Sequence, residues 1–176
     1  MTTHRVRVAV ALAGFAGLML GIALPVVPLA VARASGTRAE AGQAPARQSA
    51  NGRRVIRPEK TPNTGLPYSP GILVGNTLYL SGNLGRSPVT AELVRGGIEA
   101  ETRQALANMR EVLRAAGMDF KDVASVTAYI TSFDDFAKFN AVYREVFPTD
   151  PPARATVQVA ALNVGAHIEL QMIAAK

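Results

Sequence analysis

The stretch Pro151-Pro152-Ala153-Arg154-Ala155-Thr156-Val157-Gln158-Val159, taken with Ile168-Glu169-Leu170-Gln171-Met172 near the C-terminus, decides the fold. Apolar and polar residues alternate in both segments, which is typical of strands with one buried face. A short turn at Asn163-Val164-Gly165 separates the two segments, so the pattern predicts a terminal hairpin. Its apolar side then carries Val157, Val159 and Ala161 together with Ile168, Leu170 and Met172.

This register puts one arginine and one carboxylate on the polar face of the hairpin. Glu169 lies opposite Gln158, and Arg154 shares their face. The two charged groups are then about four residues apart along the hairpin, roughly 13 Å, which is too far for an ordinary ion pair. Each charge therefore needs another partner, and a ligand, a neighbouring subunit or bulk water could each supply it. Arg154 and Glu169 form a candidate small-molecule site.

The charge of the chain is unevenly distributed. The formal net charge is +6, but residues 1–60 carry nine Lys and Arg against two acids, whereas residues 61–176 carry ten against eleven. The second part is nearly neutral, so we expect no basic groove for nucleic acid. The chain has no Cys and only two His, which excludes a thiol nucleophile and leaves no His or Cys cluster for a metal.

The N-terminus has the pattern of an export signal. Arg5 and Arg7 precede an uncharged apolar run over residues 8–32, and Ala32-Arg33-Ala34 resembles a small-residue cleavage site. The run is also long enough to span a membrane, although Pro25 and Pro28 favour cleavage. We therefore predict a signal peptide or membrane anchor over residues 1–34, and an exported protein that is periplasmic or extracellular.

Two further segments follow the signal. Residues 35–60 are basic and poor in large apolar residues, so they predict a disordered linker. Residues 61–176 predict one folded domain with a hairpin over 72–82, a helix from Ile98 that ends at Gly117, a strand over 123–130 and a helix over 134–147. With the terminal hairpin the order is ββαβαββ, an α+β fold with two helices on one face of a single sheet.

Several residues could carry chemistry, and each also has a plain structural explanation. The planar fork of Arg154 suits a carboxylate, and Glu169 suits proton transfer or water positioning, but both could be ordinary surface charges. Tyr68 could face a pocket or cover a core edge, while Ser81 and Asn83 could contact a ligand or form a turn. Asn140 is a further polar candidate, and His167 is expected to be an isolated surface residue.

Short motifs throughout the predicted domain resemble a known family. These motifs are Leu66-Pro67-Tyr68-Ser69-Pro70, residues 75–82, Gln104-Ala105-Leu106 with Asn108, Ala115-Ala116-Gly117, Asp135-Phe136 with Asn140 and Tyr143, Pro152-Ala153-Arg154 and Val159-Ala160-Ala161-Leu162. Together they resemble the RidA (YjgF) family of reactive enamine and imine deaminases, and the resemblance runs from about residue 61 to residue 176.

The resemblance implies a chorismate-mutase-like fold, a homotrimer and ligand clefts between neighbouring subunits. It implies that Arg154 binds the carboxylate of 2-aminoacrylate or 2-iminobutyrate and that Glu169 positions the attacking water. Tyr68, Ser81, Asn140 and Thr156 match further cleft positions, and no metal or organic cofactor is implied. Asn83 departs from the family pattern, where Gln is usual, as do Asn163-Val164 and Gln171.

Three functional hypotheses follow. The first is an exported homotrimeric deaminase that converts 2-imino acids to 2-keto acids and ammonia, with a membrane contact only through an uncleaved N-terminal segment. The second is a non-catalytic module of the same fold that binds a small carboxylic acid. The third is a ribonuclease or translation inhibitor, which the near-neutral domain disfavours.

Overall fold

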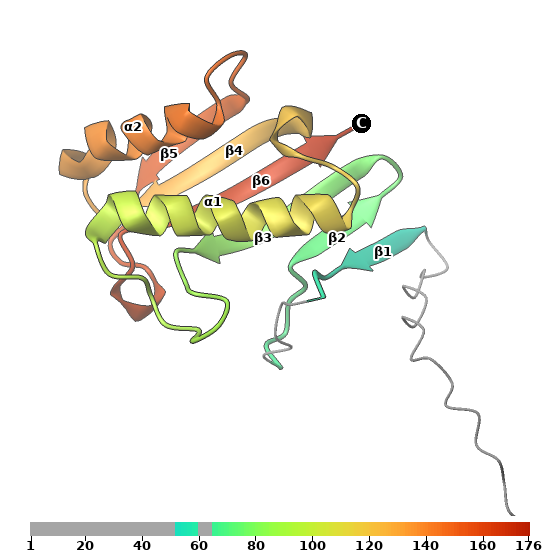
Figure 1. Ribbon diagram of the computed structural model, residues 1–176, viewed down its shortest axis with the longest axis horizontal. Coiled ribbons are helices and arrows are strands. Elements are labelled where there is room, and N and C mark those ends of the chain that lie inside the picture. The colour runs from blue at the N-terminus through green and yellow to red at the C-terminus, as the bar shows by residue number, and fades with distance from the viewer. Residues whose placement is uncertain (1–51, 60–64) are drawn as a thin grey trace, which may run out of the picture. The chain divides into compact units, whose positions relative to one another are not determined.

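One six-stranded sheet carries both helices on the same face in the computed structural model, which describes residues 52–59 and 65–176 (Figure 1). The predicted α+β class is confirmed, with two helices packed on a single mixed sheet. The strand order across the sheet is β1-β2-β3-β6-β4-β5. The elements are β1 Arg53–Ile56, β2 Gly71–Val74, β3 Thr77–Leu84, α1 Gly97–Ala115, β4 Val123–Ile130, α2 Phe136–Val146, β5 Ala153–Gln158 and β6 Ile168–Ala175.

The first strand lies inside the range that the sequence assigned to the linker. β1 pairs antiparallel with β2, with Val55 opposite Ile72, so the sheet extends to residues before position 61. The predicted export segment over residues 1–34 and the linker up to residue 51 lie outside the described residues. Within the described ranges, neither helix has the length and apolar character needed to cross a membrane.

The helices form where the apolar periodicity predicted them. α1 buries one stripe against the sheet, including Leu106, Met109 and Leu113, and ends before Gly117, whose φ of 74° is a conformation that glycine adopts without strain. α2 buries Phe139, Val142 and Tyr143. These side chains meet Leu78, Ile168, Leu170 and Met172 from the sheet in one continuous core.

A β-bulge interrupts β3 near its end. Leu80 pairs with Met172, but the next pair is Asn83 with Leu170, so β3 has one more residue than β6 between these pairs. The extra residue shifts the alternation of β3, and Leu84 now pairs with Glu169. The bulge thereby brings Ser81 and Gly82 beside the strand that carries Glu169.

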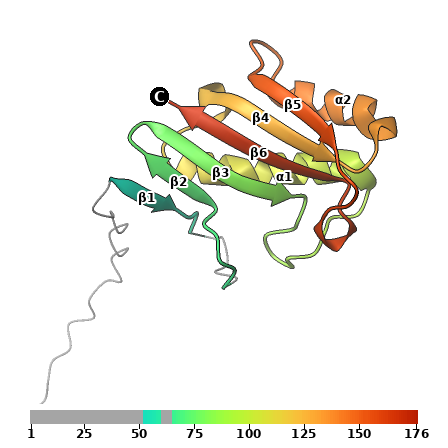
Figure 2. The ribbon, with the colours of Figure 1, turned by 180° about the vertical axis from the view of Figure 1, so that it is seen from behind.

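The predicted terminal hairpin is wrong. β5 pairs in parallel with β4, and β6 pairs antiparallel with both β3 and β4, so β5 and β6 are separated by β4. The physical reason is that β4, α2 and β5 form a β-α-β crossover, which needs a parallel partner strand, and the chain after β5 crosses the end of β4 to reach the centre of the sheet. Figure 2 shows β6 between β3 and β4, with β5 at the far edge.

The new topology assigns the polar residues of β5 to the opposite face from the one expected. Arg154, Thr156 and Gln158 pair with Val126, Ala128 and Ile130, which are buried under the helices. Arg154 and Thr156 therefore lie on the helix side of the sheet. Glu169 pairs with Tyr129 on the face opposite α1 and α2, here called the open face (Figure 2). Arg154 and Glu169 consequently do not share a face, contrary to the hairpin register.

Candidate functional site

Arg154 lies on a platform of aromatic rings from α2. Its guanidinium carbon is 4.5 Å from the ring centre of Tyr143, 4.9 Å from that of Phe139 and 5.9 Å from that of Phe136. Its Nη2 donates a 2.7 Å hydrogen bond to Asn140 Oδ1. Within residues 52–59 and 65–176, Arg154 makes no ion pair with a carboxylate. The ring faces and the amide fix the guanidinium while leaving its charge unneutralised.

A cavity of about 410 Å³ opens beside this arginine. It lies between the last turns of α2 and the loop into β5, and we call it the Arg154 cavity. Among the residues that the structure describes, its walls contain two arginines and no carboxylate, so it is suited to an anion. The lining residues are Asn140, Tyr143, Arg144, Phe147, Pro151, Pro152 and Arg154.

The phenol in the cavity wall stays neutral. Burial raises the pKa of Tyr143 to about 12, although the nearby Arg154 charge acts in the opposite direction. The Tyr143 hydroxyl is buried and has no hydrogen-bond partner among the described residues. The wall therefore gains no negative charge at neutral pH that would compete with a ligand carboxylate.

Glu169 belongs to a second cluster, at the bulge of β3. A Cβ at Gly82 would lie only 1.9 Å from Glu169 Oε1, so glycine is what lets the carboxylate lie against the strand. Ser81 Oγ donates to the Ser69 carbonyl at 2.6 Å, and the Ser81 amide donates to the Pro70 carbonyl. These bonds tie the loop that carries Tyr68, which is 53% exposed, to the strand that flanks Glu169.

Asn83 is held from the helix side. Its Oδ1 accepts a hydrogen bond from Asn108 Nδ2 at 3.2 Å, and the same Asn108 amide reaches the Arg86 carbonyl at 2.9 Å. Gln104 Nε2 donates to Asn108 Oδ1 at 2.8 Å. Asn83 pairs with Leu170 on the helix-facing side, whereas Glu169 faces the other way. The structure thus separates Asn83 from Glu169 and gives it a part in holding the bulge, while its predicted contact with substrate stays a prediction.

His167 is not isolated, in contrast to the sequence-based expectation. Its Nδ1 lies 2.6 Å from Glu101 Oε1, and its backbone amide donates to Glu101 Oε2 at 2.7 Å. Glu101 is only 1% exposed, so this buried carboxylate anchors the chain just before β6. The described residues contain no group of three or more His, Cys, Asp or Glu that could hold a metal ion.

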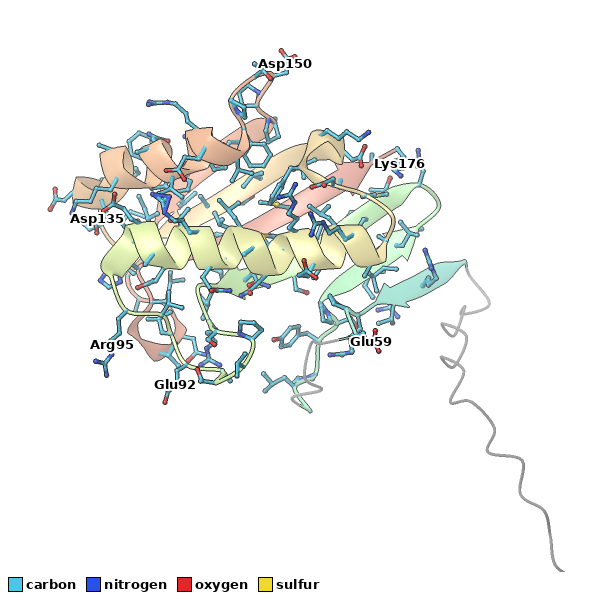
Figure 3. All side chains as sticks on the ribbon, in the orientation of Figure 1. Glu59, Glu92, Arg95, Asp135, Asp150 and Lys176 are labelled. Carbon is cyan, nitrogen blue, oxygen red and sulfur yellow. The ribbon has the colours of Figure 1, made fainter. Side chains whose placement is uncertain are left out.

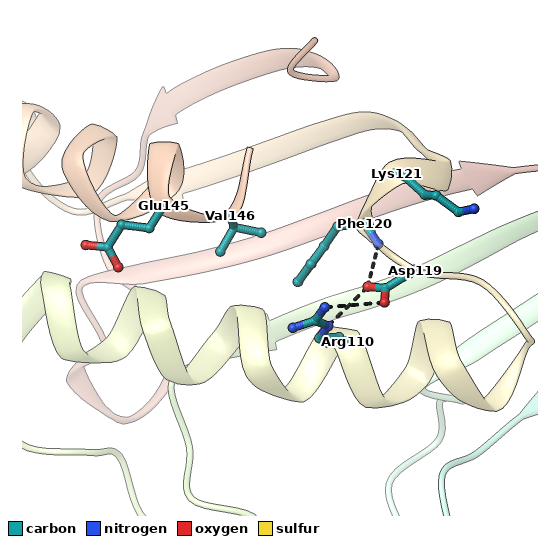
Figure 4. Close-up of a pocket in the computed structure, with 6 residues that line it drawn as sticks. All are labelled: Arg110, Asp119, Phe120, Lys121, Glu145 and Val146. Carbon is teal, nitrogen blue, oxygen red and sulfur yellow. Dashed lines mark hydrogen bonds and ion pairs between the residues drawn. The ribbon is translucent and has the colours of Figure 1, made fainter. Parts of the chain in front are cut away.

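A second cavity of about 400 Å³ lies on the outer helical side (Figure 4). Arg110 and Asp119 line it and bind each other through two hydrogen bonds of 3.1 and 3.3 Å, while Glu145 in its wall pairs with Arg103 at 2.6 Å. The Phe120 amide, followed by Arg110, holds the pKa of Asp119 below its ordinary value of 3.8. Because its two cations, Arg110 and Lys121, are matched in number by Asp119 and Glu145, this cavity offers less to a charged ligand than the Arg154 cavity does.

The structure therefore divides the predicted site residues into two half-sites. The first half-site is Arg154 with its hydrogen-bond partner Asn140, and Thr156 lies on the same face of β5. The second half-site is Glu169 beside Gly82 of β3, and Ser81 of that strand holds the loop that carries Tyr68. Sequence reasoning placed Phe136, Phe139 and Tyr143 on the predicted helix over 134–147 and missed that they support Arg154. A helical spacing of Asn140, Tyr143, Arg144 and Phe147 puts them on one face of α2, and that signal was present in the sequence.

Known proteins match this sequence and this fold. The family described as Endoribonuclease L-PSP matches residues 58–176. A 2-iminobutanoate/2-iminopropanoate deaminase of Homo sapiens is 44% identical over 122 residues, covering 69% of this chain and 89% of that protein.

Solved structures agree with the sequence comparison. The crystal structure of RidA from an Antarctic Psychrobacter is 38% identical, with a TM-score of 0.66 over 69% of this chain and 98% of that one. The YjgF gene product of E. coli is 33% identical, with a TM-score of 0.65 over 69% of this chain and 98% of that one.

Proposed function

The chain is a member of the RidA (YjgF) family, and on that premise we propose that it hydrolyses 2-imino acids of the 2-iminobutanoate and 2-iminopropanoate type to 2-keto acids and ammonia. The observation that carries this proposal is Arg154, a fixed guanidinium with no carboxylate partner among the described residues, at the mouth of an anion-accepting cavity. The name of the human relative supports the choice of substrate.

Arg154 binds the substrate carboxylate. A guanidinium offers two parallel N–H donors that match the two oxygens of a carboxylate, and the rings beneath Arg154 keep its plane from rotating. Asn140 occupies one terminal N–H group and leaves the other donors for the substrate. The carboxylate is thus oriented before the reaction, which lowers the entropic cost of reaching the transition state.

The reaction itself needs one water molecule and one proton-transfer group. An enamine substrate first tautomerises to the imine, and water then adds to the imine carbon to give a carbinolamine. The carbon–nitrogen bond breaks, ammonia leaves with the nitrogen, and the water oxygen stays as the keto oxygen. Glu169 accepts a proton from the attacking water and gives it to the imine nitrogen, and it then carries the carbinolamine hydroxyl proton to the same nitrogen as the carbon–nitrogen bond breaks. Gly82 leaves the space in which that carboxylate lies.

We propose that the two half-sites meet between protomers of a homotrimer. Arg154 lies on the helix side and Glu169 on the open face, so one chain does not present both to one substrate. The open face also exposes apolar side chains, with Tyr79 49%, Val157 45% and Ile173 37% exposed, as expected for a surface that a second copy covers. The β5 edge of one protomer would then approach the bulge of its neighbour.

A direct assay tests the activity. 2-Iminobutyrate is generated in the cuvette and trapped with semicarbazide, and the full chain is expected to divert it to 2-oxobutyrate. The variant Glu169→Gln keeps the shape of the side chain but cannot accept a proton, and kcat is expected to fall by about 100-fold or more. A wild-type rate no higher than the uncatalysed rate would instead favour the non-catalytic binding module.

Complementation tests the shared cleft. Arg154→Lys and Glu169→Gln chains are refolded together in equal amounts, with each variant refolded alone as the control. If the cleft lies between protomers, about a quarter of the clefts in mixed trimers combine an intact Arg154 with an intact Glu169, and activity returns. If one chain supplied both groups, the mixture would stay as inactive as the separate variants.

The family description Endoribonuclease L-PSP suggests ribonuclease activity as a second candidate function. Residues 61–176 carry ten basic against eleven acidic residues, and β1 adds Arg53 and Arg54, so the folded part provides little attraction for a phosphate backbone. Incubation of labelled RNA with purified protein is the test. Cleavage that disappears in the Glu169→Gln chain would establish the second function, and intact RNA would remove it.

We also propose that the protein acts outside the cytoplasm. The support is the basic N-terminus followed by the uncharged run over residues 8–32 and the small-residue site at Ala32-Arg33-Ala34. Mass spectrometry of the protein recovered from separated cell fractions checks both points. An N-terminus at residue 35 in the exported fraction is the expected result, and a full-length protein in the cytoplasmic fraction would contradict it.

A further inference from the structure

The Arg154 cavity is lined by a second cation that has no part in the proposed deaminase mechanism. Arg144 lines the cavity together with Arg154, and one comes from α2 while the other comes from the start of β5. Pro151 and Pro152, which lie between the two arginines in the sequence, also line the cavity. Their fixed φ angles make this part of the wall rigid. A volume of about 410 Å³ is sufficient for a small organic acid.

The carboxylates near this cavity are directed elsewhere. Glu145, next to Arg144 on α2, pairs with Arg103 of α1. Asp150 lies at the outer tip of the loop between α2 and β5 (Figure 3) and does not line the cavity. Asp135, at the opposite end of α2, pairs with Lys138. Among the described residues Arg144 forms no ion pair, so its charge is available to a ligand.

We propose that Arg144 binds a second carboxylate and that the protein prefers dicarboxylic imino and keto acids, with the second acid group at the end of a short side chain. The inference rests on the proposed function, because Arg154 holds the first carboxylate in both. Arg144 makes no contact with the reacting carbon in this arrangement, so it determines specificity and is not a catalytic residue. A monocarboxylic acid of the same length would leave its guanidinium without a partner.

The preference is measured by binding, independently of turnover. Isothermal titration of the full chain with 2-oxoglutarate and with 2-oxobutyrate gives two dissociation constants, and their ratio is the readout. We expect 2-oxoglutarate to bind about tenfold more tightly, because one additional charge-assisted contact typically has that effect. A ratio near one, or no detectable binding of either acid, overturns the proposal.

Variants assign the ratio to Arg144. In Arg144→Gln the ratio is expected to fall to about one, and in Arg144→Lys to an intermediate value, because an ammonium keeps the charge but loses the planar fork. Arg114→Gln is the matched control, since it removes another exposed arginine, one from α1 that is paired with Glu111. A ratio that persists in Arg144→Gln, or that Arg114→Gln lowers equally, overturns the assignment.

Hydrolysis assays keep this inference separate from the proposed function. Turnover of 2-iminobutyrate without any preference for 2-oxoglutarate would retain the deaminase and remove the role of Arg144. Tight, Arg144-dependent binding of 2-oxoglutarate without hydrolysis of either imine would remove the deaminase and retain a dicarboxylate site.

Discussion

Two arginines lie against aromatic rings in the described part of the chain, and they differ in what neutralises their charge. Arg110 on α1 lies 5.4 Å from the ring centre of Phe120 and binds Asp119 through two hydrogen bonds (Figure 4). Arg154 on β5 lies over three rings, and within residues 52–59 and 65–176 its side-chain hydrogen-bond partner is the neutral amide of Asn140. Both have a cavity of similar size beside them, about 400 and 410 Å³.

The difference teaches that cavity size alone does not mark a site. The Arg110 cavity contains its own counter-ions, so a ligand entering it would have to break an existing pair. The Arg154 cavity has cations, neutral walls and rigid support, so a carboxylate ligand completes it. What distinguishes the two regions is an uncompensated charge that the fold holds in a defined orientation.

The largest effect is expected from the same substitution made at both arginines. Arg154→Lys should lower kcat/KM for 2-iminobutyrate roughly 100-fold, because an ammonium cannot bind a carboxylate through two parallel hydrogen bonds. Arg110→Lys, which keeps a charge near Asp119, should leave the rate within twofold. Steady-state kinetics on both variants check the contrast, and equal rates for the two would break it.

The next effect comes from giving Arg154 the kind of partner that Arg110 has. Asn140→Asp introduces a carboxylate at the position whose Oδ1 accepts a 2.7 Å bond from Arg154, so it competes with the substrate. KM should rise about tenfold while kcat changes little. Asn140→Ser is the control, since it removes the amide without adding charge. A similar KM for both variants would show that a neighbouring carboxylate is not what makes the surroundings of Arg110 and Arg154 differ in ligand binding.

Removing the carboxylate partner of Arg110 should have a smaller effect, on the stability of the fold. Asp119→Asn removes the ion pair with Arg110 but keeps an oxygen that can accept from the Phe120 amide. Both partners are partly exposed, so the free energy of unfolding should fall by less than about 1 kcal/mol. Urea unfolding measures the loss, with Glu111→Gln as a control at another exposed pair. A loss of more than about 2 kcal/mol would mean that Asp119 does more than pair at the surface.

The smallest effect is the pH dependence of the Asp119 contribution. The pKa of Asp119 is lowered in the folded protein, by the Phe120 amide and then by Arg110, so its carboxylate stabilises the fold above the ordinary value of 3.8. This stability is lost as the pH falls through the folded-state pKa. The difference in Tm between the native chain and Asp119→Asn should therefore become smaller as the pH is lowered from about 5 to about 3. A constant difference across that interval would contradict the assignment.

The local elements could be predicted because their signals lie within single segments. The structure confirms the helix α1, its end before Gly117 and the strand β4. Each was predicted from residues that are close in sequence: the apolar periodicity of α1, the glycine that follows it, and the β-branched and aromatic residues of β4. The pairing of β5 could not be predicted in this way. Alternation reveals that a segment is a strand, but it does not reveal which strand lies beside it or which face is buried.

The candidate site was also predictable only where its signals lie within single segments. Arg154 and Glu169 were selected by residue type and by resemblance, and the fold makes each of them part of a defined cluster. Their relation to each other was mispredicted, because it depended on the pairing of β5. The aromatic support of Arg154 escaped notice, because a buried stripe on α2 is also what an ordinary core requires.

The sequence by itself determined the helices and strands from β2 onward, the α+β class, the family resemblance and the residue types that can bind an acid. Only the tertiary structure decided that β6 enters the sheet between β3 and β4, and that Arg154 and Glu169 face opposite sides. The physical reason is that helix and strand signals are short-range, whereas strand order depends on the α2 crossover and on burial across the whole sheet. A residue's chemistry is therefore readable from its type, but its partners are not.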